Sequence, residues 1–189
     1  MAVNNCNSMV NDIASELKIL LKLKGAAHIM KLKEIASRKE FHPLEGNPEI
    51  LTVGGEKSED YPFLLNGAKR AVEHGYKVLM LPNPKGARTA DYIFIRRNVF
   101  KLYDLKTISG KNIIESQLLD SIGQVNRVIL NMPNSYNTRL LVADIKTYFE
   151  VNPDALEVLI FKGHKEISVR RRLAENAQFY SILKKLFEQ

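Results

Sequence analysis

Apolar residues along the middle of the chain recur with two spacings, which predict alternating helices and strands. Helical spacing over residues 61–73 ends at Gly75, a residue type that commonly follows the last turn of a helix. β-branched and aromatic residues then predict strands at 76–81, 92–95 and 99–103. Further on, the pattern predicts a helix over 112–123, a strand over 125–131 and a helix over 138–149. This order predicts an α/β fold with a mixed β-sheet flanked by helices.

Both ends of the chain add elements to this core. Residues 8–38 have helical spacing, interrupted at Gly25, so we expect N-terminal helices in two pieces. Prolines and glycines punctuate residues 40–59, which we interpret as a linker with one short strand at 50–53. The predicted division is an N-terminal helical region and linker, 1–58, and an α/β domain, 59–189. The C-terminal end is predicted to form a hairpin, 156–161 with 166–170, and a helix over 173–187.

A polar turn interrupts the apolar run between residues 91 and 106. If Arg97 and Asn98 form a two-residue turn, the register of the hairpin is fixed. Arg96 then pairs with Val99. A longer turn over 96–99 is the alternative, and it would change the pairing.

The two-residue turn has a chemical consequence for three charged residues. Counting outward from it, Asp91 faces Asp104, and Lys106 shares their side of the ribbon because side chains alternate. Directly opposed residues have Cβ atoms about 5 Å apart. Carboxylates that close repel each other unless a cation lies between them, and a divalent metal suits such hard oxygen ligands. The alternative is that Asp91 only caps a turn and that the Asp-x-Lys triplet has no chemical role.

Composition narrows the functional classes. The 28 Lys and Arg against 21 Asp and Glu give a formal charge of +7, which favours a polyanionic partner such as nucleic acid. Cys6 is the single cysteine, and the four histidines lack zinc-ligand spacing, so neither an internal disulfide nor a structural zinc site is expected. A G-x-S-x-G elbow and a phosphate-binding glycine loop are both missing. We expect no membrane span and no signal peptide.

The order of elements, with Asp91 opening one strand and Asp104-Leu105-Lys106 closing the next, resembles the PD-(D/E)xK nuclease superfamily, whose core is αβββαβ. The resemblance covers residues 60–131. Within it, the closer likeness is to the C-terminal nuclease domains of bacterial contact-dependent inhibition toxins, many of which cut tRNA. The matching phrases are Gly75-Tyr76-Lys77-Val78, Leu81-Pro82, Ala90-Asp91 and Asp104-Leu105-Lys106-Thr107.

The chain departs from the superfamily pattern in three places. Ala90 stands where the motif has proline, and Asp104 stands where glutamate is commoner. The shorter side chain of Asp104 would bring a metal closer to the backbone. The glutamate often found on the first helix has no counterpart here, because that stretch reads Leu-Leu-Asn-Gly at 64–67.

The resemblance implies a divalent-metal-dependent endonuclease, a hydrolase of phosphodiester bonds. Its expected cofactor is magnesium (Mg2+) or manganese (Mn2+). The implied metal ligands are Asp91, Asp104 and the carbonyl of Leu105, and the implied catalytic residues are Asp91, Asp104, Lys106 and Gln124. Cations that flank this region are expected to hold the nucleic-acid backbone: Lys85, Arg88, Lys111 and Arg127.

The same resemblance implies a biological setting. We expect RNA, and tRNA in particular, to be favoured over DNA, and a cognate immunity protein to bind the toxin. Action in the bacterial cytoplasm is expected, after delivery as part of a larger secreted or mobile-element protein. Two alternatives stay open: a DNA-cutting nuclease, and a non-catalytic module that keeps the nuclease fold for binding or assembly.

Overall fold

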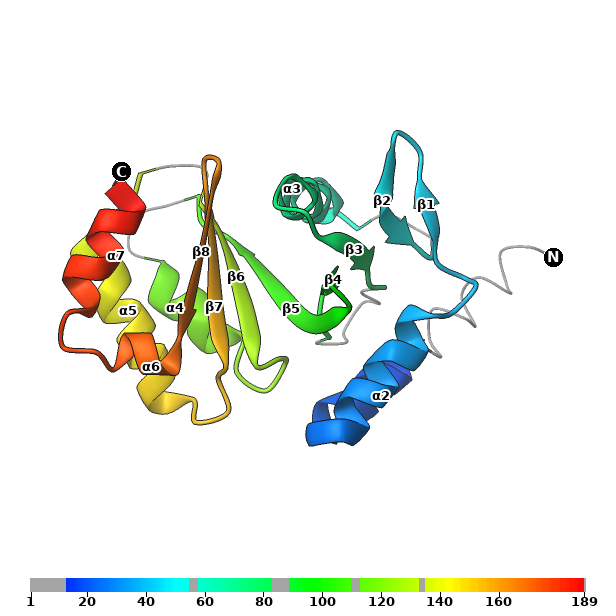
Figure 1. Ribbon diagram of the computed structural model, residues 1–189, viewed down its shortest axis with the longest axis horizontal. Coiled ribbons are helices and arrows are strands. Elements are labelled where there is room, and N and C mark those ends of the chain that lie inside the picture. The colour runs from blue at the N-terminus through cyan, green and yellow to red at the C-terminus, as the bar shows by residue number, and fades with distance from the viewer. Residues whose placement is uncertain (1–12, 55–57, 83–88, 110–112, 133–134, 189) are drawn as a thin grey trace. The chain divides into compact units, whose positions relative to one another are not determined.

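The computed structural model describes residues 13–54, 58–82, 89–109, 113–132 and 135–188. Hydrogen-bonded strands follow one another in chain order from β1 to β8, with helices between them (Figure 1). The predicted fold class, a mixed β-sheet flanked by helices, is confirmed. The chain divides into two compact units, residues 1–103 and 104–189, and the boundary falls inside one strand, β5 (Val99–Thr107).

The first unit begins with two helices, at residues 13–22 and α2 (Gly25–Ala36). Gly25 has a φ of 58°, a left-handed conformation that glycine adopts without strain, and the predicted interruption there is confirmed. Residues 8–12 of the expected helical segment lie outside the described residues. The apolar stripes of both helices are fully buried, as sequence spacing predicts: Ile13, Leu17, Leu20, Leu32 and Ile35.

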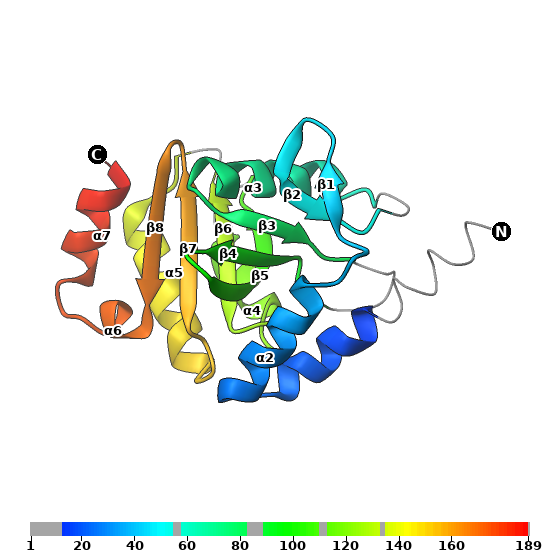
Figure 2. The ribbon, with the colours of Figure 1, turned by 45° about the vertical axis from the view of Figure 1, so that its right-hand side comes forward.

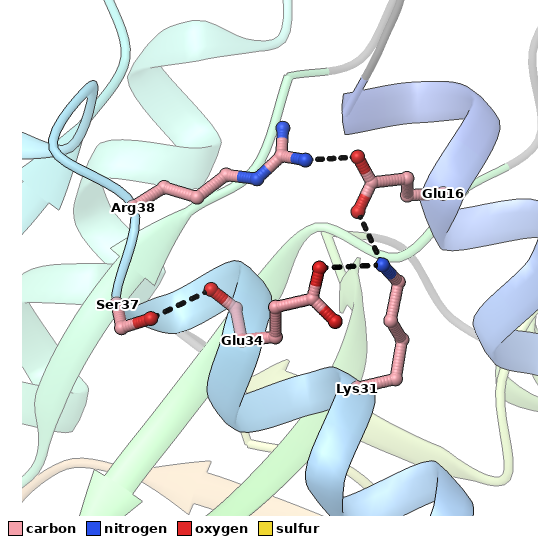
Figure 3. A network of polar contacts seen from close by, with 5 residues as sticks. All are labelled: Glu16, Lys31, Glu34, Ser37 and Arg38. Carbon is pink, nitrogen blue, oxygen red and sulfur yellow. Dashed lines mark hydrogen bonds and ion pairs between the residues drawn. The ribbon is translucent and has the colours of Figure 1, made fainter.

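A network of charged side chains ties these two helices together (Figure 3). The Lys31 ammonium lies 2.9 Å from a Glu16 carboxylate oxygen and 2.9 Å from one of Glu34. The Arg38 guanidinium also donates to Glu16. Burial alone would raise the pKa of the Glu16 carboxyl, but the hydrogen bond from Lys31 and the charge of Arg38 hold that pKa below its usual value. The ionised form of Glu16 therefore stabilises the helix pair.

In the described residues of the first unit, five strands form the sheet. β1 (His42–Leu44) is antiparallel to β2 (Asn47–Thr52), which runs parallel to β3 (Lys77–Met80). β3 pairs antiparallel with β4 (Tyr92–Arg96), and β4 with the start of β5. Helix α3 (Tyr61–Glu73), which matches the predicted range, packs beside β2 and β3 (Figure 2). The expected strand at 50–53 belongs to β2, whereas β1 was not predicted because prolines and charges dominate that stretch.

The predicted two-residue turn between β4 and β5 is confirmed. Arg97 and Asn98 both have positive φ, 50° and 59°, as a type I′ turn requires. Arg96 pairs with Val99, as expected, and the register continues to the pair Tyr92 and Tyr103. The hairpin therefore has the register from which the candidate site was predicted.

The second unit contains the end of β5, from Asp104 onward, and three more strands. The end of β5 is parallel to β6 (Arg127–Met132), β6 is parallel to β7 (Glu157–Lys162), and β7 is antiparallel to β8 (Lys165–Arg170). The C-terminal hairpin is thus confirmed. Helices α4 (Ile114–Asp120), α5 (Thr138–Val151) and α7 (Phe179–Glu188) form a neighbouring row, α4 beside α5 and α5 beside α7 (Figures 1 and 2).

The single C-terminal helix predicted over 173–187 is wrong. Two helices replace it, α6 (Arg171–Ala174) and α7. Between them, the side chain of Asn176 accepts a hydrogen bond of 2.7 Å from the backbone N–H of Gln178, and its carbonyl accepts one from Phe179. Such local bonds from asparagine compete with helical hydrogen bonding, which explains the break. In the described ranges of the chain, no helix has both the length and the apolarity needed to cross a membrane.

Candidate active site

The candidate site is built around two charged residues of β5. Asp104 and Lys106 project from the same side of the strand, since one residue separates them. Their neighbours in the β6 register are apolar, Val128 beside Asp104 and Leu130 beside Lys106. The Lys106 ammonium lies 3.0 Å from a carboxylate oxygen of Asp104. The structure therefore brings together two of the predicted catalytic residues.

This ion pair is removed from solvent to an unusual degree. The side chain of Asp104 is 5% exposed and that of Lys106 is 15% exposed. A charge pair in such a setting loses most of its hydration, and its mutual attraction only partly offsets that loss. A more exposed pair would give little information about function, because surface ion pairs are common and weak.

Helix α5 adds a buried polar group that the sequence analysis did not single out. Tyr148 of α5 is fully buried, and burial is the main reason that the pKa of its phenol lies above the usual value. Ser121 and Asn152 are near enough to oppose that increase in pKa, and the negative charge of Asp104 adds to it. The Asp104 carboxylate thus has a buried hydroxyl in its surroundings. Tyr148 follows the apolar spacing of α5, so its sequence position predicts only a core residue.

Asp91 belongs to the first unit, where its backbone is well fixed. Its N–H donates to the carbonyl of Tyr103 at 2.9 Å, and its carbonyl accepts from the N–H of Leu81 at 2.8 Å. The residue is 7% exposed. The last residue pair of the hairpin is Tyr92 with Tyr103, and Asp91 directly precedes Tyr92 in the chain. Because the N–H of Asp91 bonds to Tyr103, the partner of Tyr92, the regular ladder does not extend to Asp91, and the opposition of Asp91 and Asp104 stays a prediction.

The residues predicted to hold a metal are oxygen donors of the right chemistry. Magnesium keeps several of its waters and is commonly held through one or two carboxylates, so a small set of protein ligands is sufficient. Asp104, Asp91 and the carbonyl of Leu105 would satisfy that requirement. Within the described segments, no cluster of three or more His, Cys, Asp or Glu side chains could hold a metal ion. The metal assignment therefore depends on two carboxylates and stays a prediction.

Gln124 lies just after α4 and is 8% exposed. Its side-chain amide donates to the backbone carbonyl of Asp120 at 2.7 Å, which satisfies one of the carbonyls at the end of the helix. Ser121 is fully buried and donates to the carbonyl of Leu118 at 2.6 Å, so it does not belong to a solvated helix face. The catalytic role of Gln124 stays a prediction, beside a structural role that its hydrogen bond makes visible.

Arg127 is one of the four cations predicted to contact nucleic acid. Its Nε atom lies 3.6 Å from a carboxylate oxygen of Glu157, which is 3% exposed and also accepts a hydrogen bond of 2.5 Å from the Ser168 hydroxyl. The guanidinium therefore neutralises a buried acid, and contact with nucleic acid stays a prediction. The other three predicted cations lie outside the described residues: Lys85, Arg88 and Lys111.

Comparison with known proteins gives one structural likeness. No family model matches the chain, and no curated protein matches it. Among solved structures, the chain is similar to a CdiA-CT/CdiI toxin and immunity complex from Burkholderia pseudomallei. The two are 16% identical with a TM-score of 0.47, over 63% of this chain and 98% of the other. The roles of individual residues therefore have to be argued from their own chemistry.

Proposed function

We propose that this chain is a divalent-metal-dependent endonuclease that hydrolyses phosphodiester bonds, and that it acts as an RNA-cleaving bacterial toxin with tRNA as the favoured substrate. The observation that carries the nuclease proposal is the largely buried ion pair of Asp104 and Lys106, 3.0 Å apart and beside the apolar residues Val128 and Leu130 of β6. Replacing such a pair by apolar residues is often neutral or stabilising, so a structural role alone explains it poorly.

Lys106 has the chemistry needed for the attacking water and for the charge of the transition state. Its ammonium offers three donors, and Asp104 fixes its position. A donor held in place before the reaction stabilises developing negative charge on a phosphoryl oxygen without reorganisation. Lys106 would therefore orient the attacking water and stabilise the pentacoordinate transition state at the phosphorus.

Asp104 would serve two partners, the lysine and the metal. Asp91 and the carbonyl of Leu105 would complete the protein ligands. A bound divalent metal supplies polarisation of the phosphoryl oxygen and a lower pKa for a bound water. Asp104 and Asp91 would hold that metal by offering carboxylate oxygens.

The choice of RNA and of toxic action rests on the sequence phrases shared with contact-dependent inhibition toxins and on the formal charge of +7. Under this proposal the chain acts in the bacterial cytoplasm and meets a cognate immunity protein. The rival proposal is a non-catalytic binding module, in which Lys106 only neutralises Asp104. Both proposals predict a folded, basic protein, so only a measurement of nucleic-acid cleavage separates them.

Cleavage assays separate the two proposals. Purified protein is incubated with total tRNA and with single- and double-stranded DNA, in magnesium or in EDTA. We expect tRNA fragments in magnesium, none in EDTA, and none from the variant Lys106→Met in either. Lys146→Met is the matched control, because Lys146 is an exposed lysine of the same unit. Intact substrates under every metal condition would contradict the nuclease proposal.

A further inference from the structure

The turn between β4 and β5 carries an arginine in a backbone conformation that arginine rarely adopts. Arg97 has a φ of 50° and Asn98 a φ of 59°. Asparagine is common in this left-handed region, whereas a long side chain on a residue other than glycine is disfavoured there. Type I′ turns accordingly favour Asn-Gly or Asp-Gly at these two positions. A strained residue that persists at an exposed turn suggests that its side chain has a function there.

Within the described residues, the side chain of Arg97 makes no polar contact that would compensate for this strain. It is exposed, and no hydrogen bond or ion pair joins it to any residue in the described part of the chain. Its neighbour Arg96 differs: that guanidinium lies 4.1 Å from the ring centroid of Tyr76 and donates to the carbonyl of His74 at 3.2 Å. Arg96 is therefore anchored to the fold, and Arg97 extends from it into solvent.

Other cations surround the same end of the ribbon, on both of its faces. Lys101 lies on the Arg96 face, because it pairs with Phe94, two residues before Arg96. Lys77 lies on the opposite face, since it pairs with Ile95. On that face the Lys33 ammonium also lies 5.6 Å from the ring centroid of Phe100, the partner of Ile95. We call this set the cationic tip: Lys33, Lys77, Arg96, Arg97 and Lys101. Between residues 92 and 103 the sequence has no acidic residue.

We propose that the cationic tip is a nucleic-acid contact, with Arg97 bound to backbone phosphates. This inference rests on the proposed function, and it adds a substrate-binding element distinct from the catalytic residues. A guanidinium matches two phosphate oxygens through paired hydrogen bonds, which explains an arginine at position 97. Because this end of the sheet carries cations on both faces, it can contact phosphates of two nucleic-acid strands at once. A flat anionic membrane would engage only one of the two faces.

The strain at position 97 makes a sharp experiment available. Binding of a fluorescently labelled RNA hairpin is measured by anisotropy in EDTA, from about 50 to 200 mM salt, alongside the melting temperature. Arg97→Asn should weaken binding by about 3- to 10-fold and lower the slope of log affinity against log salt by about one. The same variant should melt about 2–4 °C higher, because asparagine tolerates the left-handed conformation. Arg97→Lys, the matched control, should keep the salt slope and show no increase in melting temperature.

A simultaneous gain in stability and loss of affinity excludes general damage to the fold. Binding with an unchanged affinity and salt slope in Arg97→Asn would overturn the inference, as would preferential binding of phosphatidylserine vesicles over RNA by the wild type. The two proposals fail separately. If the wild type cleaves tRNA and Arg97→Asn binds RNA as tightly as the wild type, only the proposal for the cationic tip is refuted. If RNA binding depends on Arg97 but the wild type does not cleave RNA in magnesium, only the catalytic proposal is refuted.

Discussion

The Lys106 ammonium lies 3.0 Å from a carboxylate oxygen of Asp104, two residues earlier on the same strand. The Asp104 side chain is buried and the Lys106 side chain is 15% exposed, so their attraction offsets part of the hydration that both charges lose. Removing one partner leaves a buried ion without its counter-charge, which is far more costly than removing both.

Single and double substitutions of this pair should therefore separate stability from activity. Lys106→Met should lower the free energy of unfolding by about 1–3 kcal/mol, because the buried Asp104 carboxylate loses its ion pair with Lys106. The double variant Lys106→Met, Asp104→Leu should recover much of that loss and remain inactive. Urea unfolding gives the stability, and tRNA cleavage in magnesium gives the activity. Full cleavage by either variant would remove Lys106 from the mechanism.

Asp91 is predicted to be the second carboxylate of the site. Asp91→Ala should reduce cleavage by at least about 100-fold, and combining it with Asp104→Ala should cost little more, because residues that act as a unit are not additive. Expression in bacteria offers an independent measure, since the wild type should slow growth and the variant should not. Asp60→Asn is the control, an exposed aspartate of the same unit without a side-chain capping bond. If the losses of activity caused by Asp91→Ala and Asp104→Ala multiplied in the double variant, the two residues would not share one site.

The pair of Arg127 and Glu157 should prove important for stability. Arg127→Met leaves the Glu157 carboxylate, 3% exposed, without its cation, so the free energy of unfolding should fall by about 1–3 kcal/mol. Arg172→Met, at an exposed position of the same unit, should have no comparable effect. The sequence prediction that Arg127 also contacts nucleic acid adds a second expectation, a salt slope lower by about one. An unchanged slope would leave Arg127 with its structural role alone.

The helix pair of the first unit should lose stability in acid through Glu16. Its carboxyl pKa is held below the usual 4.5, so the folded state binds this proton less readily than the unfolded chain. The contribution is therefore complete above pH 4.5 and disappears as the pH falls through the lowered value. Glu16→Gln should show a smaller fall in melting temperature between about pH 6 and pH 3, corresponding to roughly 0.5–1 kcal/mol. Glu45→Gln, at an exposed position, should follow the wild type.

Local chemistry made parts of the fold predictable. The turn at Arg97 and Asn98 lies between two β-prone runs, so its length could be counted and the register followed. Helix α3 has a clear apolar stripe and a glycine after its last turn. β1 was missed because Pro43 is unfavourable in strand interiors, yet an edge strand with few ladder bonds tolerates it. The break before α7 depends on the Asn176 side chain, which spacing alone does not reveal.

The candidate site was less accessible to sequence reasoning. Alternation along β5 correctly placed Asp104 and Lys106 on one side, but the burial of that side depends on helices distant in sequence. Tyr148 could not be recognised as a polar neighbour, because its position on α5 is that of an ordinary core aromatic. Arg127 looked like a free cation, and its partner Glu157 lies thirty residues away, brought beside it by the parallel pairing of β6 and β7.

β5 exchanges hydrogen-bonding partners at Tyr103, pairing with β4 before that residue and with β6 after it. A cut in the gene at that point would therefore leave residues 99–103 paired with β4 in the first fragment and residues 104–107 paired with β6 in the second.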